Sequence, residues 1–122
     1  MKSGFSSKNP ALRRRAVLAL QIRPPKNAIK LLARALTKDP SAVIRHEAAF
    51  VLGALHRRKA LSPLIKAALQ DPSDLVRHEA IEALGDLGIK TAKVKKLLLK
   101  FQKEPNPIIK DTALIAYKTL KL

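Results

Sequence analysis

The chain has 122 residues, 47% of them hydrophobic, with no cysteine and a formal net charge of +16 at pH 7. This length suits one domain, and the apolar content excludes a disordered chain. Without cysteine there is no disulfide framework, no thiolate metal site and no cysteine nucleophile. No apolar run approaches the roughly 18 residues of a membrane span, and residues 1–10 lack the apolar segment of a secretory signal. We therefore expect a soluble, cytoplasmic protein that does not enter a membrane.

Four units of similar sequence follow one another along the chain. Their equivalent alanines are spaced 32 or 33 residues apart, at Ala16, Ala48, Ala80 and Ala113. Self-similarity at a period of roughly 20–50 residues is typical of a solenoid built from stacked repeats. The units are expected at about residues 9–38, 39–70, 71–103 and 104–122 of a single domain, with residues 1–8 flexible.

Each unit predicts a first helix followed by a second helix. In chain order the predicted segments are residues 10–22 and 26–37, 41–55 and 59–70, 73–87 and 91–103, and finally 107–121 without a second helix. An acid followed by proline suits a helix start, and this pair opens the later units at Asp39-Pro40, Asp71-Pro72 and Glu104-Pro105. No segment has the alternating pattern of a strand.

The segments DPSAVIRHEAAFVLGAL and DPSDLVRHEAIEALGDLG, which begin at Asp39 and Asp71, carry a family resemblance. They resemble HEAT repeats of the short kind found in phycobilisome lyases, in which a proline-started helix is followed by Val-Arg, two alanine-class positions and Ala-Leu-Gly. The resemblance covers nearly the whole chain, more loosely in the first and last units. It implies an all-α fold, a short right-handed α-solenoid of about three and a half HEAT-like helical hairpins. It says little of function, because solenoids serve many purposes.

A His-Glu pair recurs inside this repeat, as His46-Glu47 and His78-Glu79. With Ile44 at zero on a helical wheel, the apolar stripe lies near zero and His46 lies near the opposite side, in line with Gly53. The third unit repeats the arrangement. The two histidines are therefore expected on one face of neighbouring helices, about 10 Å apart. The glycine in line with each histidine would leave room for a ligand, a metal or another protein chain.

Imidazole and carboxylate together suit iron, manganese or zinc, so the candidate metal ligands are His46, Glu47, His78 and Glu79. Helical proteins build di-iron sites from such side chains on facing helices. One chain could hold one metal, but a di-iron centre needs more ligands, which a twofold homodimer would supply. The alternative is that duplicated units share ordinary surface charges and bind no cofactor. His56, beside a run of basic residues, is expected in a basic turn.

Residues 39–122 resemble one half of deoxyhypusine hydroxylase, a HEAT-repeat enzyme of two similar halves. Each half carries two His-Glu motifs in segments such as VRHEAAEALG. In that family the four motifs hold a di-iron centre that activates oxygen to hydroxylate a modified lysine on a translation factor. The resemblance implies iron ligation by the two His-Glu pairs, and a di-iron monooxygenase once a second copy or a partner chain supplies the other half.

Clusters of basic residues suggest a competing function. Their candidate anion-binding residues are Arg13, Arg14, Arg15, Arg57, Arg58, Lys59, Lys93, Lys96, Lys100 and Lys103. Such residues bind phosphates without reading sequence. Aromatic residues for stacking single-stranded bases are scarce, which favours a duplex or structured RNA. The alternative function is therefore a non-enzymatic basic module that binds nucleic acid, a ribonucleoprotein or an acidic protein, unless these residues only form a solvated surface.

Overall fold

The computed structural model describes residues 3–122, and within them the regular structure is entirely helical. The helices are α1 (Ser3–Ser6), α2 (Pro10–Ile22), α3 (Ala28–Lys38), α4 (Ala42–Ala54), α5 (Leu61–Gln70), α6 (Asp74–Leu87), α7 (Ala92–Phe101) and α8 (Pro107–Leu120), with a short 3-10 helix, η1 (Arg58–Ala60), before α5. Together they confirm the predicted all-α solenoid of helical hairpins. No helix within these residues is both long and apolar enough to cross a membrane.

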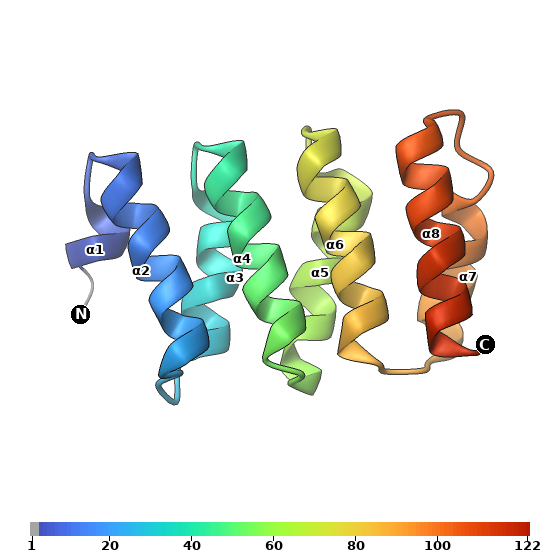
Figure 1. Cartoon of the computed structure of the whole chain (residues 1–122), viewed down its shortest axis with the longest axis horizontal. Coiled ribbons are helices and arrows are strands. Elements are labelled where there is room, and N and C mark those ends of the chain that lie inside the picture. Colours follow the sequence, from blue (N-terminus) through green and yellow to red (C-terminus); the bar gives the residue numbers. More distant parts are fainter. Residues whose placement is uncertain (1–2) are drawn as a thin grey trace.

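The helices form two layers (Figure 1). The first helices of the repeats, α2, α4, α6 and α8, lie side by side in one layer, and the second helices, α3, α5 and α7, lie behind them. The first helices begin and end within one residue of the predicted segments. The repeat pattern does not predict α1, a single turn that packs on α2 through Gly4 and Ala16.

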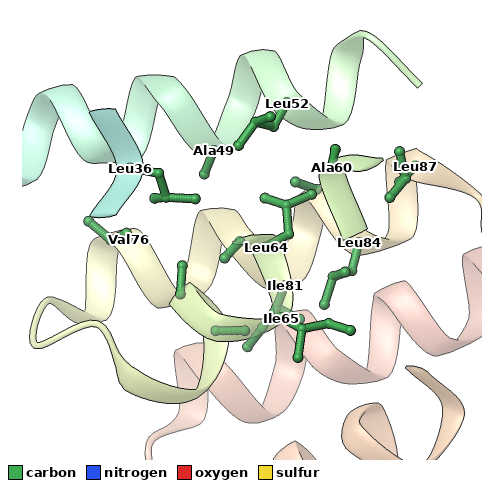
Figure 2. Close-up of a cluster of buried hydrophobic side chains, with 14 of the residues drawn as sticks. Leu36, Ala49, Leu52, Ala60, Leu64, Ile65, Val76, Ile81, Leu84 and Leu87 are labelled. Carbon is green, nitrogen blue, oxygen red and sulfur yellow. The ribbon is translucent and has the colours of Figure 1, made fainter. Parts of the chain in front are cut away.

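The hydrophobic core fills the space between the two layers. Leu32, Leu64 and Leu98 are fully buried on the three second helices, one in each repeat. Figure 2 shows Leu64 among side chains from both neighbouring first helices, including Leu52 and Ile81. Burial of each such leucine stabilises the folded state by roughly 1.5–3 kcal/mol, because its apolar side chain is removed from water. Because every second helix packs between two first helices, the core runs unbroken along the solenoid.

The acid-proline pairs do not start helices, contrary to the expectation from the sequence. Asp39 ends α3, and α4 begins only after the N-cap residue Ser41, whose hydroxyl accepts a hydrogen bond from the Ile44 N–H. The Asp39 carboxylate instead accepts the Ser41 N–H and lies in the loop between repeats. Proline takes the first helical position where the N-cap is asparagine, as at Asn106 before α8.

Glycine allows successive first helices to approach closely. A Cβ built on Gly53 would lie 2.8 Å from Ala83 Cβ and 3.0 Å from its Cα, while one built on Gly85 would lie 3.2 Å from Ala116 Cβ. Both glycines are buried in these contacts. The expectation that they leave room for a ligand or another chain is therefore wrong. The space beside each glycine is taken by the next repeat of the same chain.

We predict that Gly53→Ala lowers the free energy of unfolding by about 1–3 kcal/mol, because the α6 backbone must move to admit the new Cβ. Gly85→Ala is the matched control. Its contact is looser, so the gain in helix propensity of up to about 1 kcal/mol offsets most of the crowding. Urea denaturation followed by circular dichroism measures both. Equal stabilities of the two variants would contradict a tighter contact at Gly53.

Candidate functional site

His46 and Glu47 lie on opposite edges of α4, where they face different neighbours. The wheel centred on Ile44 places His46 opposite the core, and this is wrong. The buried arc of α4 extends from Val51 through Leu52 to Gly53, because the second helices cover its centre and a first helix covers each side. His46 therefore faces α6 and Glu47 faces α2. Neither residue is a fully solvated surface charge.

One contact repeats between successive first helices. The side chain at the histidine position of one repeat meets the side chain at the glutamate position of the next. Arg14 donates to Glu47 Oε1 at 3.0 Å from Nε and 2.8 Å from Nη2. His46 Nε2 lies 2.8 Å from Glu79 Oε1, and His78 Nδ1 lies 2.6 Å from Thr112 Oγ1. The candidate ligands thus belong to a row of polar contacts that crosses every repeat boundary.

A row of ion pairs runs beside this row of polar contacts and also links successive repeats. Arg13 pairs with Asp39, Arg45 with Asp71, and Arg77 with Glu104, so each arginine holds the acid that precedes the next first helix. The Arg45 and Asp71 side chains are 12% and 5% exposed. Arg45 also donates from Nη1 to the Asp39 carbonyl oxygen. These contacts set the register of the first helices, and with it the positions of His46 and His78.

Glu79 is the buried carboxylate of the candidate site. Burial above all, together with the nearby carboxylates of Glu82, Asp86 and Glu47, raises the pKa of this carboxyl from its ordinary 4.5 to about 7, although His78 acts to lower it. Negative charge is therefore concentrated around Glu79 although the chain as a whole is strongly basic. A bound cation would relieve this repulsion and favour the ionised carboxylate.

His78 borders a small groove between α6 and α8. The groove has a volume of about 250 Å³ and is lined by the carboxylates of Glu82 and Asp86 and by apolar groups of Ile115 and Ala116. His78 Nε2 lies 3.2 Å from Glu82 Oε2 and its side chain is 32% exposed. The groove therefore combines acidic and apolar walls next to a candidate ligand.

The residues fit part of a metal site. His46 and Glu79 are in contact, whereas Glu47 is held by Arg14, and His78, which precedes Glu79 on α6, contacts Thr112 on α8. Imidazole and carboxylate donors are of the right kind for iron. Within residues 3–122, however, no three His, Asp or Glu side chains gather closely enough to hold a metal ion by themselves. A complete site needs ligands from elsewhere.

Within residues 3–122, some of the candidate anion-binding residues form ion pairs with acids, and the others are exposed to solvent without a partner acid. Arg13 and Arg14 form ion pairs with acids. The other candidates form no ion pair within the described residues and are exposed on α2, between α4 and α5, or on and after α7: Arg15, Arg57, Arg58, Lys59, Lys93, Lys96, Lys100 and Lys103. His56 lies in that turn with φ of 55° and is exposed, as expected of a basic turn. Further exposed cations on the second helices, including Arg34 and Lys66, do not stand out in the sequence because neither is next to another basic residue.

The fold and the repeated contacts define a class of protein. The family described as HEAT repeats matches residues 29–118, and the chain belongs to this family. Among curated proteins no match was found. Among solved structures, the chain is similar to human deoxyhypusine hydroxylase in complex with glycerol, with 30% sequence identity and a TM-score of 0.83. The match covers 94% of this chain and 39% of the human protein, so the chain resembles part of that enzyme.

The raised pKa of Glu79 predicts a pH dependence of stability in the metal-free protein. The folded state holds this proton more tightly than the unfolded state, so the resulting stabilisation is present below pH 4.5 and is lost as pH rises through about 7. The Glu79→Gln variant does not lose this stability as pH rises, because glutamine does not ionise. We expect it to match the wild type in acid and to be more stable by up to about 3 kcal/mol near pH 8.5.

Urea denaturation in the presence of a chelator, repeated across this pH range, measures the effect. Asp111→Asn is the control, because it makes the same acid-to-amide change at an exposed residue of α8. A stability difference between Glu79→Gln and wild type that stays constant with pH would contradict the raised pKa.

Proposed function

We propose that the chain is a half-length relative of deoxyhypusine hydroxylase in which His46, Glu47, His78 and Glu79 supply half of a di-iron site. A second copy of the chain supplies the other half. The observation that carries the proposal is the contact of His46 with Glu79, which joins the two His-Glu pairs across a repeat boundary. The similarity to the human hydroxylase, of which this chain spans 39%, supports it.

The number of ligands argues for a second copy. Four His-Glu pairs around a shared cavity would give two iron ions enough ligands, whereas one chain has two pairs. Glu47 must leave Arg14 to bind a metal, and Arg14 is 53% exposed. The Glu47 side chain is 15% exposed, but an ion pair whose arginine is this open to solvent is worth about 1 kcal/mol, so its loss costs little.

The hydrogen bond to Thr112 determines which nitrogen of His78 could bind a metal. The Thr112 hydroxyl donates its proton to the Ile108 carbonyl oxygen at 2.6 Å, so it accepts a hydrogen bond from His78 Nδ1. In the neutral imidazole this puts the lone pair on Nε2, which would bind a metal in place of its present 3.2 Å contact with Glu82 Oε2. Partners of this kind orient histidine ligands in many metal sites. Thr112 occupies the glutamate position of the last repeat, so this position supports the site without adding a ligand.

The groove beside His78 suits a cationic side chain. The deoxyhypusine hydroxylase family acts on a modified lysine, and the Glu82 and Asp86 carboxylates would attract an amine to the groove. Ile115 and Ala116 would contact its methylene groups. A bound iron centre would supply the activation of oxygen, and the groove would hold the carbon to be hydroxylated next to it.

We predict that anaerobic incubation with ferrous iron loads about one iron per chain, measured by elemental analysis after desalting. The variant His46→Gln/His78→Gln should lose this iron, because glutamine is a weak iron ligand that still hydrogen-bonds Glu79 and Thr112. His56→Asn is the control, since His56 lies in a turn whose positive φ asparagine tolerates. Wild-type protein without iron, or a double variant that retains it, would overturn the proposed metal site.

Iron should also control the oligomeric state. Without metal, the carboxylates around Glu79 in two facing copies repel one another, so the chelated protein should sediment as a monomer. With ferrous iron it should sediment as a dimer, and His46→Gln/His78→Gln should stay monomeric. Analytical ultracentrifugation measures both states. An iron-loaded protein that remains a monomer would exclude the shared site while leaving metal binding itself intact.

A further inference from the structure

The two layers of the solenoid carry different charges. The second helices α3, α5 and α7 contain no acid. All acidic residues of the chain lie on first helices or in the loops before them, at Asp39, Glu47, Asp71, Asp74, Glu79, Glu82, Asp86, Glu104 and Asp111. The net charge of +16 is therefore distributed unequally between two opposite surfaces of the molecule.

Every cation of the second helices is exposed. They are Lys30, Arg34 and Lys38 on α3, Lys66 on α5, and Lys93, Lys95, Lys96 and Lys100 on α7. In the part of the chain that the structure describes, none of them forms an ion pair, since the paired cations all lie on first helices. This surface is positive and uncompensated.

Three of these cations, one on each second helix, lie alike relative to the buried side of their helix. Arg34, Lys66 and Lys96 each follow a fully buried residue by two positions, namely Leu32, Leu64 and Val94. Two positions turn a helix by about 200°, which points these side chains away from the core. We call these three residues the cationic column. The column follows the long axis of the solenoid, with one cation on each of the three second helices.

We propose that the cationic column binds the phosphate backbone of a nucleic-acid duplex. A row of evenly spaced cations without acids matches a regular array of phosphates and reads no base sequence. The second helices have one aromatic residue, Phe101, and it is buried, so they offer no platform for stacking single-stranded bases.

Other polyanions fit this surface less well. Leu69 and Leu99 are the large apolar residues exposed on the second helices, and each is only about 40% exposed. A helix that lies in a membrane surface adds a broad apolar face to its charge, and these helices have none. An acidic protein partner would require buried apolar or aromatic anchors at the centre of its interface. The column offers charge alone, which favours a duplex backbone.

Fluorescence anisotropy with labelled duplexes of about 20 base pairs, one of RNA and one of DNA, tests the proposal. The variant Arg34→Gln/Lys66→Gln/Lys96→Gln should bind about tenfold more weakly near 100 mM salt, and its log-log salt slope should be shallower by up to about 3. The matched control Arg23→Gln/Lys110→Gln/Lys118→Gln removes the same charge from exposed residues of or next to the first helices. It should bind within about twofold of wild type.

Equal losses in the two triple variants would overturn the proposal, because binding would then follow net charge rather than the column. Binding to anionic vesicles or polyglutamate without binding to either duplex would overturn it as well. The column lies in the layer opposite His46 and His78, so duplex binding should persist in chelator and in His46→Gln/His78→Gln. Its outcome is therefore separate from that of the metal site.

Discussion

Close packing of successive first helices is the constraint on which the rest of the structure depends. Gly53 against Ala83 lets α4 lie directly on α6, and Gly85 against Ala116 lets α6 lie directly on α8. A helix packed in this way is covered on three sides, so its remaining polar positions fall at the edges of its contacts. That geometry brings His46 of one repeat onto Glu79 of the next. These two candidate ligands meet because their helices pack directly against each other.

This packing also explains the electrostatics of the site. At the edge of a helix contact Glu79 is nearly buried, and the acids of α6 follow it along the same helix. The net charge of +16 suggests that a cationic substrate would be repelled, but the charge near His78 is negative. At physiological salt, charges beyond about 8 Å are largely screened. The local acids therefore decide what the groove attracts.

The repeat in the sequence was enough to predict the fold and the helix segments, because equivalent alanines and leucines recur at a fixed period. It also selected the His-Glu pairs. The direction in which His46 points could not be predicted, because a wheel drawn for one helix omits the neighbours that widen its buried arc. The role of Asp39 was missed for a similar reason, since its partner Arg13 lies 26 residues earlier. Contacts between repeats decide both.

The cationic column could not be predicted from the repeat period, for another physical reason. Leu32 and Leu64 are 32 residues apart but Val94 follows after only 30, because the loops between first and second helices differ in length. Alignment on the buried residues restores the register. A dimer formed through the first helices would leave a column exposed on each outer surface. Two columns on one particle would bind a long duplex more tightly than one, provided that the duplex reaches both. Metal-dependent dimerisation would then strengthen duplex binding without contributing any new contact.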